Sequence, residues 1–156
     1  MSNFSSNGIT EEISDIFSSI QGEGVFVGRR FIFVRFRNCN LNCAYCDTPR
    51  KNVTGMKLEN PQGSGDMQYF PLPVSLKTAG ETIDIFISSG IHEAVSLTGG
   101  EPLLADKEFL RSLLKMIKEY GVTAYVETNG TLPNALKHII DLVDHVCMDI
   151  KIESAT

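Results

Sequence analysis

The chain has 156 residues, of which 42% are hydrophobic and 21% charged, a composition typical of one soluble globular domain. The formal net charge of −5 argues against a broad basic surface, so nucleic acid and anionic membranes are poor candidate partners. No stretch approaches the ~20 apolar residues that cross a bilayer, and the start MSNFSSNGITEE lacks the features of a secretory signal. We therefore expect one cytoplasmic domain, residues 1–156, with a small-molecule ligand.

The first predicted element is a buried strand at residues 30–37, where aromatic and β-branched side chains are concentrated. A cysteine-rich loop follows it directly. The next stretch, 49–75, is polar, is interrupted by glycine and proline and has no sustained period, so we expect a loop insertion. A helix is then predicted at 76–89, because apolar side chains recur there at helical spacing before Gly90, which suits a C-terminal cap.

The rest of the chain alternates strands with helices. Short apolar strands are predicted at 94–97 and 123–126, and a last one at 145–150. Helices are predicted at 106–120, which begins with a capping aspartate, and at 133–142, which begins with a proline. Strands that alternate with helices form right-handed βαβ units, so the predicted fold class is α/β with a parallel sheet or partial barrel.

Four polar motifs stand at or just after predicted strand ends. Ligands of such sheets gather at the carboxyl ends of the strands, which meet at one edge. We therefore expect one face of the protein to collect all four motifs, which are CAYCDT, TGGEP, ETNGT and DIK.

Cys39, Cys43 and Cys46 form a C-x3-C-x2-C run. Three thiolates from one short loop suit an iron–sulfur cluster, and three ligands for four irons leave one position open for chemistry. The alternatives are disulfides, which need an oxidising compartment, and structural zinc, which takes four ligands. The other cysteine, Cys147, lies inside a predicted strand and is expected to be a small buried apolar residue.

This loop resembles that of the radical S-adenosylmethionine (SAM) superfamily. Tyr45 fills the aromatic position between the last two cysteines, and TGGEP at 98–102 is similar to the superfamily's glycine-rich segment. The resemblance implies a parallel-sheet partial (β/α) barrel, a [4Fe–4S] cluster on the three cysteines and SAM on the open iron. Paired glycines would let the backbone approach the amino group of SAM, although a simple strand-to-loop turn would use them as well. The implied SAM contacts are Tyr45, Gly100, Glu127, Asp149, Ile150 and Lys151.

Two of these contacts have ordinary alternatives. Glu127 stands at a strand end, where the family contacts the ribose hydroxyls of SAM, but a loop carboxylate there could simply be solvated. Lys151, at the end of DIK, could likewise be an exposed terminal cation.

Within the superfamily, three features look most like the 7-carboxy-7-deazaguanine synthases. The segment ISDIFSSIQGEG at 13–24 resembles their N-terminal strand and loop, and Arg35 stands where they keep a substrate-binding arginine. The motif CDT at 46–48 is similar to theirs, in which the threonine, here Thr48, binds Mg2+. The resemblance implies a carbon–nitrogen lyase that converts 6-carboxy-5,6,7,8-tetrahydropterin to 7-carboxy-7-deazaguanine with loss of ammonia, on the route to the tRNA nucleosides queuosine and archaeosine.

The residues themselves are compatible with these roles. Gln21 offers a donor and an acceptor, as the amide edge of a pterin requires. The planar fork of Arg35 matches a carboxylate, although an ion pair within the sheet would explain it too. Thr48 is a weak oxygen ligand that Mg2+ tolerates, and a turn-capping role is its alternative. The implied substrate contacts are Ile20, Gln21, Gly22, Arg35 and Thr98.

The resemblance weakens at the C-terminus, because the family continues past DIK whereas this sequence ends at Thr156. We expect a barrel shortened there, with an exposed sheet edge that favours a homodimer. The family also implies a flavodoxin- or ferredoxin-like electron donor. Two alternative functions are an activating enzyme for a glycyl-radical protein, which does not need QGEG or CDT, and an inactive truncated cluster-binding protein.

The three histidines, His92, His138 and His145, have no carboxylate or cysteine partner at a spacing typical of a catalytic triad or metal site. We expect no functional role for them.

Overall fold

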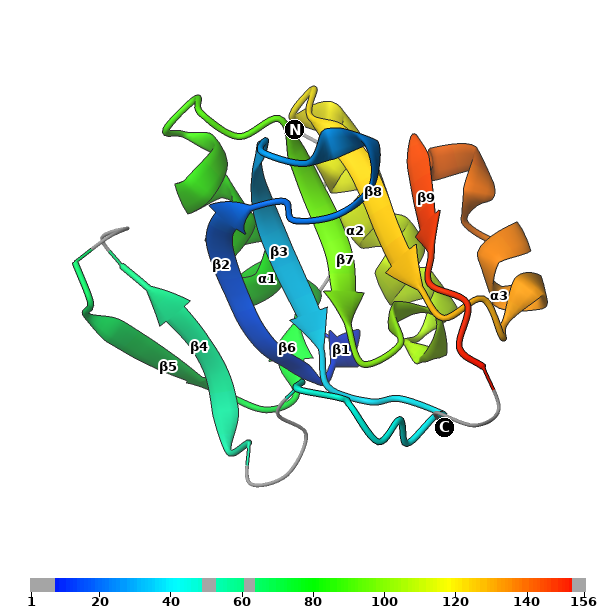
Figure 1. Ribbon diagram of the computed structural model, residues 1–156. Helices are drawn as coiled ribbons and strands as arrows, with labels where there is room; N and C mark the ends of the chain where they lie inside the picture. The colour runs from blue at the N-terminus through cyan, green and yellow to red at the C-terminus, as the bar shows by residue number, and fades with distance from the viewer. Residues whose placement is uncertain (1–7, 49–52, 61–63, 153–156) are drawn as a thin grey trace.

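Within the described residues, 8–48, 53–60 and 64–152, this computed structural model contains a seven-stranded sheet in the order β5-β4-β2-β3-β7-β8-β9 (Figure 1). Four of its strands run parallel to one another from the centre to one edge. The predicted α/β class and mostly parallel sheet are confirmed. The four parallel strands are β3 (Arg30–Phe36), β7 (Ala94–Gly99), β8 (Thr123–Thr128) and β9 (His145–Met148).

The other half of the sheet is mixed. Strand β2 (Ile13–Ile20) reaches β3 through the short 3-10 helix η1 (Gly24–Phe26) and pairs with β3 antiparallel. On its other side β2 pairs parallel with β4 (Gly55–Glu59), and β4 pairs antiparallel with β5 (Met67–Pro71). A separate two-stranded ladder joins β1 (Thr10–Glu11) to β6 (Val74–Ser75).

The prediction of a loop insertion at 49–75 is therefore wrong for part of this segment. Strands β4 and β5 form a hairpin there, while residues 49–52 and 61–63 lie outside the described part of the chain. The polar pattern concealed the hairpin because β5 is an exposed edge strand, in which four of the five residues face solvent. Only Met56 and Leu58 of β4 show the alternation that indicates a half-buried strand.

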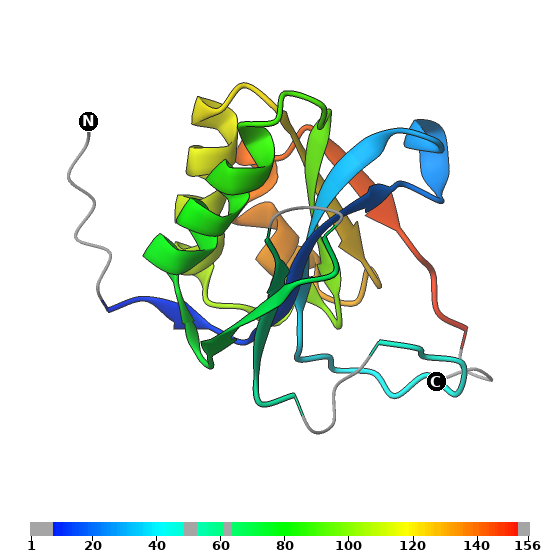
Figure 2. The ribbon, with the colours of Figure 1, turned by 90° about the vertical axis from the view of Figure 1, so that its left-hand side faces the viewer.

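Two long helices cover one face of the sheet (Figure 2). Helix α1 (Leu76–Ile87) begins where Ser75 Oγ accepts a hydrogen bond from Thr78 N, and α2 (Lys107–Glu119) begins where the Asp106 carboxylate accepts two backbone N–H groups. Both helices were predicted from their spacing. In the described residues no helix is long and apolar enough to cross a membrane.

The last predicted helix, 133–142, is shorter than expected. Helix α3 (Pro133–Lys137) ends at a cap on His138, and a 3-10 turn, η3 (Ile140–Leu142), follows it. The side chain of Ile139 is 1% exposed, because the chain turns there to place it in the core. Burial of Ile139 therefore takes precedence over continuation of the helix.

Successive side chains of a strand point to opposite faces of the sheet, and this alternation separates the core from the site. On β3, Ile32 and Val34 belong to the large core beneath the helices. Phe31 and Phe33 point to the other face, where they join a small aromatic cluster with Tyr125 of β8. Further along this helix-free face, aromatic side chains give way to polar ones at the carboxyl ends of the strands.

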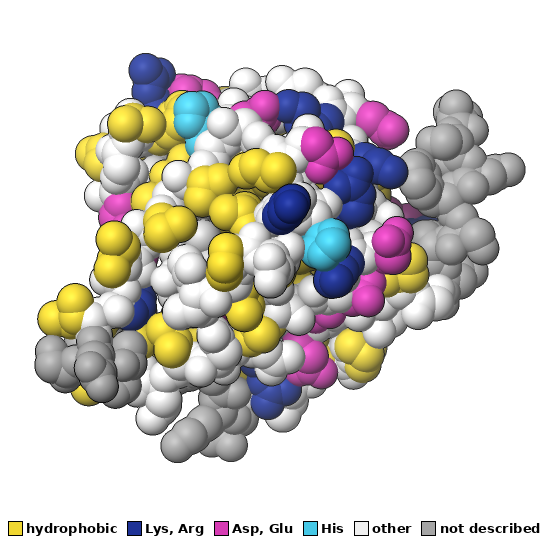
Figure 3. All heavy atoms as spheres, turned by 90° about the vertical axis from the view of Figure 1, so that its right-hand side faces the viewer, with side chains coloured by type: hydrophobic (Ala, Val, Ile, Leu, Met, Phe, Trp, Pro, Cys, Tyr) yellow, Lys and Arg dark blue, Asp and Glu magenta, His cyan; other side chains and the backbone are white. Residues whose placement is uncertain are grey.

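Strand β9 is the edge of the sheet on the parallel side. Val146 and Met148 are 36% and 52% exposed. Figure 3 faces this side of the molecule and shows hydrophobic side chains gathered on it. Within the described residues, β9 has a strand partner on one side only.

The end of β7 lies directly against the segment that leads into the cysteine loop. A Cβ atom on Gly99 would lie 2.4 Å from Phe36 O, and one on Gly100 would lie 2.1 Å from Asn38 O. Gly99 also has a φ of 107°, which L side chains rarely adopt. The backbone N–H groups of Gly100 and Glu101 donate to these same two carbonyls, both at 2.7 Å. The paired glycines are thus needed for contact between two segments of this chain.

We predict that Gly100→Ala lowers the free energy of unfolding by about 1–3 kcal/mol, because the added methyl group overlaps backbone that cannot move freely. Urea denaturation of the apoprotein followed by circular dichroism measures the change. The control is Gly22→Ala, since no atom lies within 4 Å of a Cβ built there. Equal stability of the two variants would contradict the prediction.

His92 is a buried structural residue. Its Nε2 lies 2.8 Å from Ser18 Oγ and its Nδ1 lies 3.2 Å from Ser89 Oγ. Burial lowers the pKa of His92 below its ordinary value of 6.5; a backbone contact with Phe86 opposes this in part, and the charge of Arg30 adds to it. The folded state therefore holds fewer protons than the unfolded state just below pH 6.5.

It follows that the contribution of His92 to stability is fully present above pH 6.5 and is lost as the pH falls below that value. We expect His92→Gln to reduce the loss of stability as the pH falls below 6.5. Urea titrations across this range measure it, with His138→Gln at an exposed histidine as the control. A pH dependence in His92→Gln as steep as in the wild type would show that another group is responsible.

Candidate active site

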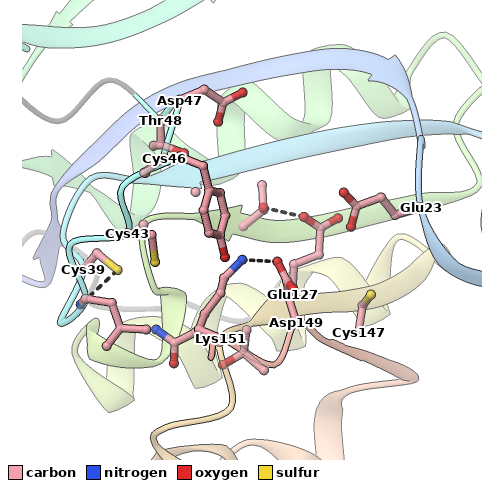
Figure 4. Close-up of a pocket in the computed structure, with 17 residues that line it drawn as sticks. Glu23, Cys39, Cys43, Cys46, Asp47, Thr48, Glu127, Cys147, Asp149 and Lys151 are labelled. Atoms are coloured by element: carbon pink, nitrogen blue, oxygen red, sulfur yellow. Dashed lines mark hydrogen bonds and ion pairs between the residues drawn. The ribbon is translucent and has the colours of Figure 1, made fainter. Parts of the chain in front are cut away.

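A pocket of about 380 Å³ opens at the carboxyl ends of the parallel strands (Figure 4). All four polar motifs reach it, as their positions at strand ends predict. The residues of these motifs and of the cysteine run that line it are Cys39, Cys43, Tyr45, Cys46, Asp47, Thr48, Thr98, Gly99, Gly100, Glu127, Thr128, Asn129, Asp149 and Lys151. Glu23, Leu41 and Cys147 also line it.

The cysteine loop brings Cys39, Cys43 and Cys46 to one side of this pocket. Cys39 and Cys43 are half-buried and Cys46 is exposed, and a turn closes between the last two, where Cys46 N donates to Cys43 O at 3.1 Å. All three are free thiols. They can therefore reach a group placed in the mouth of the pocket.

These residues fit an iron–sulfur cluster better than a single zinc ion. Among the described residues, no three His, Cys, Asp or Glu side chains converge so as to hold one metal ion. A cuboidal cluster has no need of such convergence, because each thiolate binds a different iron, and its ligands are sulfur alone. The donor set and its spread along one loop match that requirement.

Glu127 of β8 is held by three donors, two on the neighbouring strand β7 and one on the residue that follows β2. Its carboxylate accepts hydrogen bonds from Gln21 Nε2 at 2.8 Å, Ser96 Oγ at 3.0 Å and Thr98 Oγ1 at 2.5 Å. Ser96 is fully buried and Gln21 is 4% exposed. Glu127 is therefore not a freely solvated loop carboxylate, and its orientation at the pocket wall is set by the sheet.

Gln21 lies behind the pocket wall rather than in it. Its amide nitrogen donates to Glu127, and its amide oxygen accepts from Glu23 N at 3.0 Å. Its backbone also closes the following loop, because Gln21 N donates to Arg29 O at 2.8 Å and Gly28 N donates to Gln21 O at 2.9 Å. The neighbour that reaches the pocket is Glu23, which the sequence interpretation did not single out.

The other predicted substrate contacts differ in position. Thr98 lines the pocket, whereas Ile20 and Gly22 are exposed and stand outside its lining. Arg35 faces Asp15, with Nη1 3.6 Å from Oδ2, and its guanidinium lies 4.8 Å from the centre of the Phe17 ring. In this structure Arg35 therefore adopts the ion-paired role that the sequence left open as its alternative.

At the far end of β9, Lys151 reaches back across the pocket. Its ammonium pairs with Asp149 and lies 5.1 Å from the centre of the Tyr45 ring, on the cysteine loop. Burial lowers the pKa of Lys151, but hydrogen bonds to Asp149 and then Tyr45 outweigh it, so the pKa lies above its ordinary value. Lys151 is thus a paired cation rather than an exposed terminal one. Ile150, which lies between the two paired residues, is 77% exposed and lies outside the pocket lining.

Thr48 and Asp47 lie beside Cys46, on the side of the pocket away from Cys147 (Figure 4). Thr48 is half-buried and Asp47 is exposed. Two oxygen-bearing side chains next to a loop cysteine suit a hard cation such as Mg2+, which binds through one or two protein groups and keeps several waters.

Cys147 corrects a sequence expectation. It is half-buried and lines the pocket on the side opposite the other cysteines, instead of being a buried apolar residue. Burial and a hydrogen bond with Cys147 raise the pKa of the Tyr125 hydroxyl, so this tyrosine stays protonated. The register that pairs Cys147 with Glu127 turns its side chain toward the site.

Glu101, the acid of TGGEP, is the important residue that sequence reasoning missed. It is 1% exposed, and its carboxylate accepts hydrogen bonds from Leu103 N at 3.1 Å, Thr128 Oγ1 at 2.8 Å and Asn129 N at 2.8 Å. It therefore joins the end of β7 to the end of β8. The sequence did contain a signal for this role. Glu101 follows the glycine pair and precedes the apolar residues 102–104, where a solvated acid would have no obvious role.

Comparison with known proteins indicates the same superfamily as the cysteine loop. The family model of the Radical SAM superfamily matches residues 33–154. The 7-carboxy-7-deazaguanine synthase of Geobacter sulfurreducens is 40% identical over an alignment of 148 residues, and the match covers 93% of this chain and 58% of that protein. The synthase of Methanothermobacter thermautotrophicus is 43% identical over 140 residues, 90% of this chain and 49% of that protein.

A solved structure is similar as well. The crystal structure of QueE from Escherichia coli matches with a TM-score of 0.57 and 26% identity, over 78% of this chain and 53% of that chain. This chain thus spans about half the length of the proteins it matches. Because the superfamily match covers most of the sequence and includes all three loop cysteines, the chain belongs to the radical SAM superfamily.

Proposed function

We propose that this chain carries the radical SAM site of a 7-carboxy-7-deazaguanine synthase, a carbon–nitrogen lyase that converts 6-carboxy-5,6,7,8-tetrahydropterin to 7-carboxy-7-deazaguanine with loss of ammonia. The observation that carries the proposal is the convergence of the cysteine loop, CDT, TGGEP and ETNGT on one pocket. The names of its relatives support the same reaction.

Cys39, Cys43 and Cys46 would hold the [4Fe–4S] cluster, with SAM in the adjoining pocket. Cluster and SAM, when bound, supply the one-electron chemistry that begins the reaction by removing a hydrogen atom from the substrate carbon beside the ring nitrogen. The task of this chain is then to position SAM and the pterin and to exclude water.

The charges of the pocket suit a cationic ligand. Its lining contains four acids, Glu23, Asp47, Glu127 and Asp149, and its one lysine, Lys151, is already paired. SAM carries a positive sulfonium group, and uncompensated carboxylates attract such a charge. Lys151 and Asp149 would contact the charged amino-acid end of SAM, beside Gly100 and Tyr45.

Thr98 would accept a hydrogen bond from the substrate. Because its hydroxyl donates its proton to Glu127, the lone pairs of Thr98 Oγ1 are left for an N–H group in the pocket. Glu127, which is oriented by its three donors, fixes the direction in which the Thr98 hydroxyl donates and therefore the direction in which its lone pairs point. Gln21 would act through Glu127 and through the loop that it closes, which supports Glu23 at the pocket.

The substrate carboxylate would be recognised by Arg35. The separation of 3.6 Å from Asp15 is longer than a good hydrogen bond, so the guanidinium can turn from this pair to a carboxylate that it binds with two N–H groups. Thr48 would bind Mg2+, which would help to hold the same carboxylate.

A one-electron reaction requires a donor, which we infer to be a flavodoxin- or ferredoxin-like protein. The exposed apolar residues of β9 support association of two copies in a homodimer. We place the protein in the cytoplasm, where free thiols stay reduced.

The reaction is tested in an anaerobic assay of reconstituted protein with reductant, SAM, Mg2+ and 6-carboxytetrahydropterin. We expect 7-carboxy-7-deazaguanine in the mass spectrum, and its loss in Cys43→Ala together with the loss of bound iron. The control Cys147→Ser is expected to retain its iron. 5′-Deoxyadenosine without the deazapurine would contradict the proposed substrate and favour a glycyl-radical activator, and absence of both would favour an inactive cluster-binding protein.

Thr48→Val is expected to raise the Mg2+ concentration needed for half-maximal product formation by roughly tenfold, because the ion loses its protein oxygen ligand. Thr48→Ser keeps the hydroxyl, so its half-maximal Mg2+ concentration should stay near that of the wild type. Titration of Mg2+ at saturating SAM measures both variants. The same Mg2+ dependence in Thr48→Val as in the wild type would remove Thr48 from the metal site.

A further inference from the structure

The cysteine loop is tied to the turn after β8 through one side chain, Asn40. Asn40 Nδ2 donates to Thr131 Oγ1 at 2.8 Å, and Asn40 Oδ1 accepts from Asn129 Nδ2 at 3.0 Å. Both halves of the amide are therefore engaged. Asn40 lies between Cys39 and Cys43, so these bonds hold the loop between its first two cysteines.

The three side chains form a closed ring of hydrogen bonds with one consistent direction. Asn129 Oδ1 accepts from Thr131 N at 3.0 Å and from Thr131 Oγ1 at 2.6 Å, which leaves Asn129 Nδ2 free to donate to Asn40. Thr131 Oγ1, having donated its proton, accepts from Asn40 Nδ2. A change in any one of the three side chains interrupts the ring.

The turn that carries Asn129 and Thr131 is itself anchored in the core. Asn129 N donates at 2.8 Å to the carboxylate of Glu101, which is 1% exposed. Gly130 N donates to Thr128 Oγ1 at 3.2 Å, and Thr128 in turn donates to Glu101. The ring therefore connects the cysteine loop to a fixed point of the protein.

The side-chain ring around Asn40 is separate from the backbone hydrogen bond that holds the chain just before the cysteine loop. The backbone bond from Glu101 N to Asn38 O holds the chain before the first cysteine, and it does not reach the residues inside the loop. The loop from Cys39 to Cys46 is not part of a helix or strand. The side chain of Asn40 anchors the loop from within, to a different part of the protein.

We propose that Asn40, held by Asn129 and Thr131, is a positioning residue that fixes Cys39 and Cys43 for binding of the iron–sulfur cluster. Groups that orient metal ligands without touching the metal change metal affinity by roughly 10–100-fold. The ring is exposed to solvent, so its removal should affect the loop far more than the stability of the whole domain. This inference rests on membership of the superfamily and does not depend on the substrate.

The test measures iron retention. Wild type, Asn40→Ala, Thr131→Val and Thr131→Ser are reconstituted anaerobically, and the loss of visible absorbance is followed after addition of an iron chelator. We expect Asn40→Ala and Thr131→Val to lose iron roughly tenfold faster than the wild type. Thr131→Ser keeps the hydroxyl and should match the wild type. The control is Asn134→Ala, at an exposed asparagine of α3 that has no side-chain hydrogen bond in the described structure.

A second measurement uses the apoprotein, so that no cluster is needed. Hydrogen–deuterium exchange should become faster in peptides that cover residues 39–46 in Asn40→Ala and Thr131→Val, with unchanged exchange in α2 and β7. The double variant should exchange no faster than either single one, since each change interrupts the same ring.

Three outcomes would overturn the proposal. Wild-type iron retention in Asn40→Ala would show that the loop does not need this anchor. Equal losses in Thr131→Ser and Thr131→Val would show that the hydroxyl is not the group that matters. Faster exchange throughout the protein would assign the effect to general stability. None of these readouts uses the pterin, so failure of the proposed reaction would leave them unaffected.

Discussion

The buried carboxylate of Glu101 is the contact on which the arrangement of the site depends. Its oxygens hold Thr128 and Asn129 at the end of β8, while its own backbone N–H holds Asn38 at the start of the cysteine loop. A carboxylate that is 1% exposed is tolerable only because each oxygen accepts a hydrogen bond, since an unpaired buried charge is far more costly. Through this one residue the ends of β3, β7 and β8 are held together, and the ring around Asn40 extends the same support into the cysteine loop.

A second carboxylate, Glu127, has a different role although it lies on the neighbouring strand end. Its three donors are side chains from β7 and from the residue after β2, and it faces the pocket. Glu101 therefore joins backbone segments, whereas Glu127 sets the direction of the polar groups that a ligand meets. Two of the donors to Glu127 follow from strand register, because residues on one face of neighbouring parallel strands stand side by side, which brings Ser96 and Thr98 of β7 to Glu127 of β8.

Much of the fold could be predicted from local patterns, and the failures have physical reasons. Helix α2 was predictable because Asp106 caps it and its apolar residues recur at helical spacing. Strand β5 was not, since an exposed edge strand has no buried face to impose alternation. In the site, Arg35 and Gln21 could be identified as polar residues near the motifs, but whether they face the pocket depends on Asp15 and Glu127, which are distant in sequence. Cys147 was misjudged because strand membership alone does not say which face lies over an open pocket.

The sequence by itself determined the chemistry of this protein: the C-x3-C-x2-C loop, the glycine pair and the acids at strand ends specify which ligand types are available, because these properties belong to individual residues and their spacing. Only the tertiary structure decided which of these groups meet. It brought the glycine pair against a second backbone segment, placed Lys151 over the ring of Tyr45, and joined Asn40 to Asn129 and Thr131. These contacts join residues far apart in the chain, so they exist only once the packing of helices on the sheet has fixed the register of its strands.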